Sequence, residues 1–341
     1  MNPEVQVLTD TAGSDRAWRV SVVVPAYERV GPLRALLDSL LEQRLSVGAF
    51  EVIVANDGSG PELADAVRSY AAAFERLVLV TAPNAGPGIA RNRGARVARS
   101  EILTFIDSDC LATPGWLDHL AAAVENGSGM AHGSVRSSVP RMEPFIHSFQ
   151  LEGPGTPTGI FAIRRTLFER LGGFDPKLSR AGEDHAFFAR AKAAGILPDF
   201  VADAPVLHPP RLKRVAIRGV AGSDQLDWGE TVRAVCGLAP EWRARYAGEN
   251  RRLLLKAAVK AGLLFVPFVL PFGRPWIWTS GFALLFTLAF GKWLRANRAL
   301  AAAKEPIRVP FGDAVRYALL FAFADALALL ERARYRILFF K

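Results

Sequence analysis

The sequence predicts an α/β fold in which a mostly parallel sheet is flanked by helices. Two β-branched runs, residues 20–24 and 50–55, are typical of buried strands. Between them, residues 32–43 carry leucines at helical spacing, with a proline in the first turn. Strands that alternate with helices form parallel sheets covered on both faces. The alternation continues with a predicted helix at 61–74, a strand at 77–81, a helix at 88–98 and a strand at 102–106.

The chain is long enough for two units. Its 341 residues, half of them hydrophobic, can bury a large core. The first 210 residues contain 20 Lys and Arg against 24 Asp and Glu, whereas the remaining residues contain 22 against 9. We expect an N-terminal extension at 1–18, an α/β domain at 19–210, a basic helical linker at 211–260 and an apolar, basic helical region at 261–341.

The basic C-terminal part predicts an anionic partner. A basic surface binds nucleic acid or an anionic membrane. Because this part of the chain is also its most apolar and aromatic part, the sequence favours the membrane, and nucleic acid is not an expected partner. Cys110 and Cys236 have no close-spaced partner and residues 1–18 lack an apolar signal core, so the α/β domain is expected in the cytoplasm.

Polar residues follow four of the predicted strands. They lie in segments 25–28, 56–57, 83–86 and 107–109. Ligands of parallel sheets bind beyond the carboxyl ends of the strands, so we expect these segments to line one site. Asp107 and Asp109 are one residue apart, and two carboxylates so placed can present a divalent cation to a diphosphate. A solvated acidic turn is the alternative for such a pair taken alone.

Six short motifs follow one another along the chain. They are 20–28 (VSVVVPAYE), 54–59 (VANDGS), 84–92 (NAGPGIARN), 105–109 (FIDSD), 171–175 (LGGFD) and 182–184 (GED). Together they resemble the serial motifs of family 2 glycosyltransferases, which are inverting enzymes with a GT-A fold. The resemblance covers residues 19–210. It implies a nucleoside diphosphate sugar as the donor, with a UDP-sugar as the first expectation.

The resemblance implies that the nucleoside pocket lies at the ends of the first two strands. Asp57 would contact uracil, since a carboxylate can accept the imino hydrogen of a pyrimidine. A helix N-cap or an Asx turn is the structural alternative for this residue. The family more often has two aspartates where this chain has Asn56 and Asp57, so a role is expected for Asp57 alone. The other residues expected to line the pocket are Pro25, Ala26, Tyr27 and Glu28.

The loop after the third strand is also predicted to bind the nucleotide sugar. Its glycines do not form the dinucleotide pattern, so a Rossmann cofactor site is disfavoured. Asn84 lies in this loop, and Arg91 is near the start of the next helix, from which an arginine can reach the nucleotide. A solvated helix face is the alternative for Arg91. Gly159, in a predicted strand beneath the donor sugar, leaves space for a sugar ring.

A divalent metal is the expected cofactor. Mg²⁺ or Mn²⁺, held by carboxylates and both phosphates, would stabilise the charge on the diphosphate leaving group. Asp109 is the predicted direct ligand, and Asp107 would reach the ribose or the water shell of the metal. His208 follows another predicted strand and would be a third ligand, as a C-terminal histidine often is in the resembling fold. A structural histidine is the alternative.

Transfer with inversion requires a base that deprotonates the acceptor hydroxyl as it attacks the anomeric carbon. Glu183 and Asp184 open a predicted helix, where the helix dipole keeps a carboxylate ionised. Capping explains one acid at this place but not two. In the resembling family the second acid of the pair is the base. Asp184 is therefore predicted as the base, and Glu183 as the residue that positions the acceptor or a loop.

Three apolar segments occupy the C-terminal part. Residues 261–273 are too few to span a bilayer as a helix, and 275–291 are near the lower limit. In 314–330, Arg316 and Asp325 lie on opposite sides of a helix, so one of them would face lipid in a single span. Helices that lie in the interface or re-enter are therefore expected, on the cytoplasmic face of the inner membrane. A soluble helical cap or a dimerisation surface is the alternative, and a homo-oligomer is compatible with either.

These expectations combine into a metal-dependent inverting glycosyltransferase that acts on a hydroxyl of a membrane-proximal, lipid-linked or polysaccharide acceptor. One rival is a nucleotidyltransferase on a similar sheet, which should show a glycine-rich basic loop where this chain has residues 25–28. The other rival is a membrane-attached scaffold with a degenerate transferase domain. The aspartates at positions 57, 107, 109 and 184 argue against such a loss of chemistry.

Overall fold

The chain divides into two compact units in the computed structural model. The first unit comprises residues 1–136 and 150–209, and the second comprises 137–149 and 210–341. The structure describes residues 3–11, 18–45, 49–139, 146–147, 151, 153, 159–178, 182–212, 251–252, 254–255, 275–305 and 308–321. Most of the predicted linker at 211–260, the apolar segment 261–273 and the chain beyond residue 321 lie outside the described residues.

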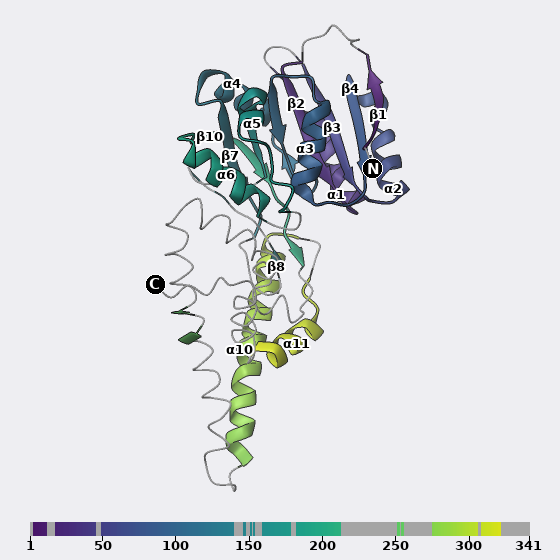
Figure 1. Ribbon diagram of the computed structural model, residues 1–341. Helices are drawn as coiled ribbons and strands as arrows, with labels where there is room; N and C mark the ends of the chain where they lie inside the picture. Colours follow the sequence, from purple (N-terminus) through teal and green to yellow (C-terminus); the bar gives the residue numbers. More distant parts are fainter. Residues whose placement is uncertain are drawn as a thin grey trace. The chain divides into compact units, whose positions relative to one another are not determined.

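A nine-stranded sheet forms the centre of the first unit (Figure 1). The strands lie in the order β1-β4-β3-β2-β5-β9-β7-β10-β6. Their bounds are β1 Glu4–Asp10, β2 Val20–Ala26, β3 Phe50–Asp57, β4 Arg76–Ala82, β5 Ile102–Phe105, β6 Leu111–Ala112, β7 Met130–Arg136, β9 Phe161–Arg164 and β10 Asp199–Leu207. All seven residues of β2 are buried, as expected for an apolar strand in the interior of a covered sheet.

The sheet is mixed, which corrects the prediction of a mostly parallel sheet. The four predicted strands β2 to β5 do run parallel as neighbours, and β7 is parallel to β10. However, β1 pairs antiparallel with β4, β9 with both β5 and β7, and β6 with β10. A hydrophobic run predicts a strand but not its direction, which depends on where the connecting segment crosses the sheet. Strand β1 was not predicted and lies within the expected N-terminal extension.

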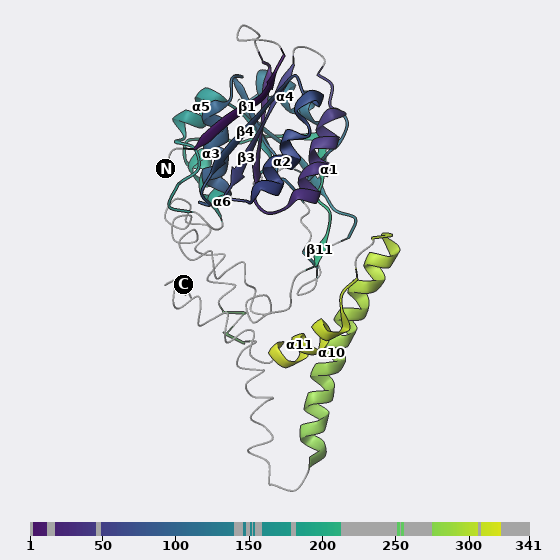
Figure 2. The same ribbon diagram turned by 90° about the vertical axis from the view of Figure 1, so that its right-hand side faces the viewer.

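Helices cover both faces of this sheet. Figure 2 shows α3, α5 and α6 on one side of the sheet and α1, α2 and α4 on the other. Their bounds are α1 Val30–Leu41, α2 Pro61–Arg68, α3 Pro87–Val97, α4 Trp116–Asn126, α5 Arg165–Arg170 and α6 Glu183–Ala193. The predicted helix at 61–74 ends earlier, at Arg68, and a single 3₁₀ turn follows at Ala71–Ala73.

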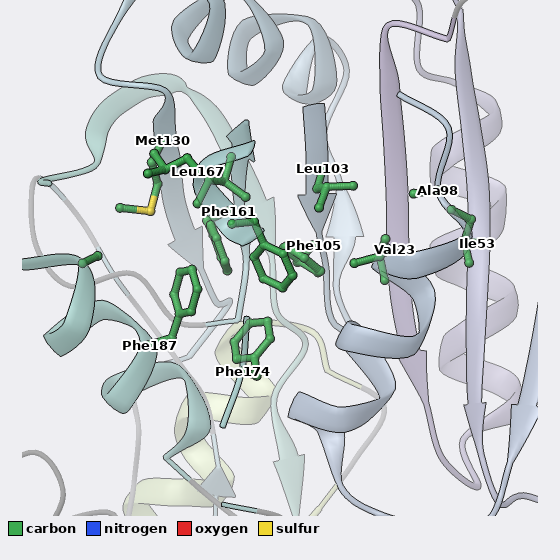
Figure 3. Packing of buried hydrophobic residues seen from close by; sticks show 14 of the residues in the cluster. Val23, Ile53, Ala98, Leu103, Phe105, Met130, Phe161, Leu167, Phe174 and Phe187 are labelled. Carbon is green, nitrogen blue, oxygen red and sulfur yellow. The ribbon is translucent and has the colours of Figure 1, made fainter. Parts of the chain in front are cut away.

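An aromatic cluster joins the sheet to α6 and to the loop before it. Four fully buried rings gather on one face of the sheet (Figure 3). They belong to Phe105 of β5, Phe161 of β9, Phe174 of the loop before α6 and Phe187 of α6. Ring centroids lie 5.0 Å apart for Phe105 and Phe161, and 5.1 Å apart for Phe174 and Phe187. Aromatic pairs at these distances contribute about 0.5–1.5 kcal/mol each beyond their buried area. The cluster therefore fixes the start of α6 against the end of β5.

The described residues of the second unit include two helices and a short pair of strands. They are α10 Pro275–Ala302, α11 Phe311–Phe321, β8 Ile146–His147 and β11 Arg211–Leu212. The indole nitrogen of Trp293 donates to the carbonyl of Val309 at 2.9 Å, and Asn297 Oδ1 accepts the Val309 N–H at 2.9 Å, so the entry to α11 is tied to α10. Among the described helices, none combines the length and the apolar character that crossing a bilayer requires.

Candidate functional site

The predicted polar segments lie at the carboxyl ends of parallel strands, as the fold prediction requires. Pro25 and Ala26 end β2 and are buried, whereas Tyr27 and Glu28 beyond them are exposed. Glu28 adopts a φ of 55°, a conformation that costs free energy for a residue with a side chain. Its N–H donates to Ser59 Oγ at 2.9 Å, which ties the end of β2 to the turn after β3.

Asp57 holds the loop between β4 and α3. Its Oδ1 accepts the N–H of Ala85 at 3.0 Å, and its Oδ2 accepts the N–H of Gly86 at 2.8 Å. Arg93 of α3 pairs with the same carboxylate at 3.0 Å. The side chain that caps the turn after β3 is Asn56 and not Asp57, because Asn56 Oδ1 accepts the Ser59 N–H at 2.9 Å. Asp57 is thus a buried anchor of the predicted nucleotide loop, and its contact with uracil stays a prediction.

The predicted nucleotide loop lies close against the turn that follows β3. Asn84 is exposed in this loop. Gly58 has a φ of 87°, and a Cβ atom on it would lie 2.6 Å from the backbone nitrogen of Asn84. A residue with a side chain would therefore push the two loops apart. The structure brings the predicted pocket residues of β3 and β4 together, with Asn84 at their exposed rim.

Arg91 joins two parts of the candidate site that are distant in the sequence. Its Nη1 donates to Glu183 Oε1 at 2.8 Å, and its Nη2 donates to Asp107 Oδ1 at 2.6 Å. The residue is buried, so the alternative of a solvated helix face is wrong. Burial by itself disfavours the charge, but the carboxylates of Asp107 and Glu183 outweigh it and raise the pKa of Arg91 above its ordinary value.

The space at Gly159 is filled by this arginine. A Cβ atom on Gly159 would lie 2.0 Å from Nη2 of Arg91 and 2.5 Å from its Cζ. This finding corrects the prediction that Gly159 leaves space for a sugar ring. Gly88 has a similar role on the other side, because a Cβ there would lie 2.9 Å from Cγ of Glu183. Two glycines therefore let the ion pair form within a packed interior.

The two acids at the start of α6 have different surroundings. Glu183 is buried, and burial raises its pKa, with Arg91 opposing the shift and Asp184 adding to it. For Asp184, burial acts to raise the pKa, but the hydrogen bond and charge of His185, together with Arg91, lower it overall. Oδ1 of Asp184 accepts the N–H of His185 at 2.7 Å and lies 2.8 Å from its Nδ1. Asp184 is thus held in the ionised form that a general base needs.

Of the three predicted metal ligands, the structure brings two together. His208 Nε2 lies 3.9 Å from Asp109 Oδ1, whereas the Asp107 carboxylate is engaged by Arg91. Cys110 joins the pair, because one ligand atom each of Asp109, Cys110 and His208 lie within 4.8 Å of one another. Cys110 was not predicted as a ligand from the sequence, although its position directly after Asp109 was a signal.

These three residues fit a divalent cation in part. A carboxylate and an imidazole are ordinary ligands of Mn²⁺, and a carboxylate suits Mg²⁺, whereas a thiolate suits softer ions. Burial raises the pKa of the Cys110 thiol well above its usual range, and the nearby Asp107 and Asp109 add to the shift. Cys110 is therefore a neutral thiol in the metal-free protein. Asp109 and His208 could hold the ion.

The loop at residues 172–175 is fixed by a residue that sequence reasoning gave no role. Asn92 of α3 donates from Nδ2 to the carbonyl of Phe174 at 2.8 Å and accepts the Phe174 N–H on Oδ1 at 2.9 Å. Arg190 of α6 donates to the carbonyl of Gly173. Gly172 and Gly173 have φ angles of 79° and 64°, which favour glycine. The two glycines of this motif therefore have a backbone role.

Residues 21–174 match the family model "Glycosyl transferase family 2". The chain carries a family 2 glycosyltransferase domain. The resemblance inferred from the six motifs is confirmed. The matched segment of the glycosyltransferase domain includes Asp57, Arg91, Asp107 and Asp109. Glu183, Asp184 and His208 lie beyond it and are tied to it by the contacts of Arg91 and Asp109.

Several relatives of the glycosyltransferase domain carry the names of glycosyltransferases or polysaccharide biosynthesis proteins. The glycosyltransferase AglE of Haloferax volcanii is 26% identical over 206 residues, which are 56% of this chain and 67% of AglE. The succinoglycan biosynthesis protein ExoW of Rhizobium meliloti is 30% identical over 204 residues, 50% of this chain and 62% of ExoW. The poly(ribitol-phosphate) beta-glucosyltransferase of Bacillus spizizenii is 31% identical over 146 residues, 42% of this chain but only 21% of that enzyme. The chain thus spans a quarter or less of some curated relatives it matches.

Solved structures confirm the fold of the glycosyltransferase domain. Residues 1–349 of S. aureus TarS align with 89% of this chain and 90% of the TarS chain, with a TM-score of 0.51 and 18% sequence identity. A second TarS structure, in complex with UDP, aligns with a TM-score of 0.50. At this sequence identity the similarity establishes the fold alone. The fold is GT-A-like, with a mixed sheet flanked by helices.

Proposed function

We propose that the chain is a metal-dependent inverting glycosyltransferase that moves a sugar from a nucleoside diphosphate sugar to a hydroxyl group of a glycan or lipid-linked acceptor. One observation carries the proposal: Arg91 joins Asp107, in the predicted donor site, to Glu183, which stands beside Asp184 at the start of α6. The carboxylates of the predicted donor side and base side, which are far apart in the sequence, are thus held at one place. This is the arrangement that direct displacement at an anomeric carbon requires.

The donor is a nucleoside diphosphate sugar, with a UDP-sugar as the first choice. The end of β2 and the loop anchored by Asp57 supply a rim with the exposed Tyr27 and Asn84, suited to a base and a ribose. The side chain of Asp107 keeps 33% of its surface exposed, so it can also face a ribose hydroxyl. The UDP bound to TarS, which shares the fold, supports uridine as the nucleoside.

Asp109 and His208 would hold Mg²⁺ or Mn²⁺. The ion would stabilise the negative charge that develops on the diphosphate leaving group. Arg29 Nη1 donates to Asp109 Oδ2 at 2.5 Å and compensates the negative charge of this carboxylate. Arg29 comes from the exposed segment after β2, and its side chain is 45% exposed, so it can turn away toward a phosphate.

Asp184 is the base in this proposal. It would take the proton of the acceptor hydroxyl as the hydroxyl oxygen attacks the anomeric carbon on the face opposite the diphosphate. The ionised state that His185 and Arg91 favour keeps it ready to accept this proton. Glu183 is engaged by Arg91 and buried, so its role is to position the start of α6 rather than to contact the acceptor.

The acceptor in this proposal is a membrane-proximal, lipid-linked or polysaccharide glycan. Support comes from relatives named for O-antigen biosynthesis, succinoglycan biosynthesis and poly(ribitol-phosphate) glucosylation. The second unit adds exposed aromatic residues, Phe290 of α10 and Phe311 of α11, and an exposed Arg295 on α10. Such a combination suits peripheral attachment to an anionic membrane surface, which we place at the cytoplasmic face of the inner membrane.

The decisive experiment measures nucleoside diphosphate release. Purified protein is incubated with a panel of nucleotide sugars, with Mn²⁺ or Mg²⁺ and with EDTA. The wild type is compared with Asp109→Ala, Asp184→Asn and the exposed control Asp203→Asn. We expect donor-selective release that requires metal, fails in the first two variants and persists in the control. Metal-dependent nucleotide binding without any turnover, even with added membrane extract as a source of acceptor, would favour the scaffold function instead.

A further inference from the structure

Arg91 is placed where the motif segments of the glycosyltransferase domain meet. It belongs to α3, and its guanidinium contacts Asp107 after β5 and Glu183 at the start of α6. The ring of Phe174, from the loop at 172–175, lies 5.3 Å from the guanidinium carbon. Gly159, just before β9, leaves the space that the guanidinium fills. One side chain thus contacts the segments that carry the predicted donor and base residues.

The surroundings of Arg91 disfavour a direct nucleotide contact. Its side chain is only 4% exposed, and both terminal nitrogens are engaged by carboxylates at 2.6 and 2.8 Å. Direct binding of a diphosphate would require the guanidinium to leave two buried or half-buried partners. The uncompensated charge would then make binding costly.

Arg91 forms a bridge, that is, two ion pairs that join Asp107 to Glu183. Its two bonded carboxylates come from different elements, and Asp184 acts electrostatically on it from the next residue of α6. A planar guanidinium donates to two separate carboxylates from two nitrogens held in fixed directions, whereas an ammonium group must donate from a single nitrogen. Arg91 therefore supplies the positive charge between the two carboxylates and sets the distance between them.

We propose that Arg91 is a positioning residue, which sets the spacing between Asp107 on the donor side and the Glu183–Asp184 pair on the acceptor side without touching either substrate. This inference rests on the proposed function. It replaces the nucleotide contact predicted for Arg91 from the sequence. Because a displacement of about 1 Å between reacting groups can cost about 100-fold in rate, loosening this bridge should act on turnover and not on donor affinity.

The test separates turnover from binding. Arg91→Lys keeps the charge but has one donor centre, and Glu183→Gln weakens the same bridge from its other end. For each variant we would measure kcat and KM for the donor found with the wild type. We would also measure Mn²⁺-dependent UDP binding by calorimetry and near-UV circular dichroism as a check of folding. The contrast is Arg93→Lys on the same helix, whose partner is Asp57.

We expect Arg91→Lys to lower kcat about 100-fold while UDP binding stays as in the wild type. Arg93→Lys should instead weaken UDP binding more than it lowers kcat, because its partner Asp57 anchors the predicted nucleotide loop. Weaker UDP binding in Arg91→Lys with kcat retained would overturn the proposal and make Arg91 a nucleotide ligand. If Arg91→Lys does not fold, Glu183→Gln decides alone, and an unchanged kcat in it overturns the proposal. A wild type that neither binds UDP nor turns over any donor refutes the proposed function itself.

Discussion

Arg29 donates from Nη1 to Oδ2 of Asp109 at 2.5 Å, so the carboxylate predicted to bind the metal already has a cationic partner. On its other oxygen, Asp109 faces His208 at 3.9 Å. A metal ion at this place would have to compete with the arginine, because two cations cannot approach the same carboxylate without repulsion. Arg29 thus tunes how tightly the site can hold a cation.

Arg29→Gln should tighten Mn²⁺ binding by about twofold to fivefold, since an ion pair this exposed is worth about 0.5–1 kcal/mol. The measurement is a titration of free Mn²⁺ by electron paramagnetic resonance in the absence of nucleotide. Arg34→Gln is the matched control, because Arg34 lies on α1 and its Nη1 donates to Ser69 instead. Equal Mn²⁺ affinities in all three proteins would show that Arg29 does not compete with the metal.

The residues next to Asp109 should differ in their effect on metal-dependent activity. His208→Ala removes an imidazole that faces Asp109, and we expect it to weaken Mn²⁺ binding and Mn²⁺-dependent nucleotide release about 10-fold or more. Cys110→Ser should change either quantity less than about twofold, because a thiol is a soft ligand, whereas Mg²⁺ and Mn²⁺ prefer oxygen ligands such as the Asp109 carboxylate. A loss of Mn²⁺ affinity in Cys110→Ser that matches His208→Ala would instead make the thiol a metal ligand.

Gly159→Ala should lower both stability and activity. The added methyl group would lie 2.0 Å from Nη2 of Arg91 and must displace it from Asp107. Overpacking of this kind costs about 1–3 kcal/mol of unfolding free energy, and the loss of the bridge should lower kcat as in Arg91→Lys. The control is Gly31→Ala in α1, where an added Cβ would have no atom within 4 Å apart from its own stretch of the chain, and alanine favours the helix. Urea unfolding and nucleotide release measure the two effects, and a fully active Gly159→Ala would contradict the account of this space.

The pH dependence of stability should reveal the ionised state of Asp184. Its pKa in the folded protein lies below the ordinary 3.8, so its ionisation stabilises the fold above that value, and this contribution is lost as the pH falls through the folded pKa. Asp184→Asn should therefore be less stable than the wild type near pH 7, with the difference shrinking below about pH 4. Asp203→Asn, at an exposed position, corrects for general charge effects. A difference that grows in acid would mean that burial, not His185, dominates the pKa of Asp184.

The central part of the fold could be predicted from the sequence, and the edges of the sheet could not. The runs that became β2 and β3 are apolar because both faces of these strands are covered, and this leaves a direct signal. In β1, by contrast, Val5 and Val7 are exposed at an edge, so the strand depends on its pairing with β4 and not on burial. Strand direction in the second half of the sheet depends on long connections, which no local pattern encodes.

The site shows the same division between local and distant causes. Carboxylates at strand ends and at a helix start follow from local patterns, so Asp57, Asp109 and Asp184 could be named as candidates from the sequence. Their partners are set by packing between distant segments. The pairing of Arg91 with Glu183 depends on Gly159 and Gly88 leaving space, and neither glycine signals this in its own surroundings.

The second unit should bind anionic membranes through α10. Arg295, Arg298 and Phe290 are exposed on this helix, and Phe311 is exposed at the start of α11. A basic residue near an anionic surface contributes about 1 kcal/mol, so Arg295→Gln with Arg298→Gln should weaken vesicle binding about 10-fold to 30-fold. The measurement is cosedimentation of the full chain with phosphatidylglycerol vesicles, and raised salt should weaken binding too, because it screens exposed charges. A double variant of Arg170→Gln with Lys177→Gln removes the same charge from exposed positions of the first unit, and the same loss in both double variants would mean that net charge, not this surface, drives attachment.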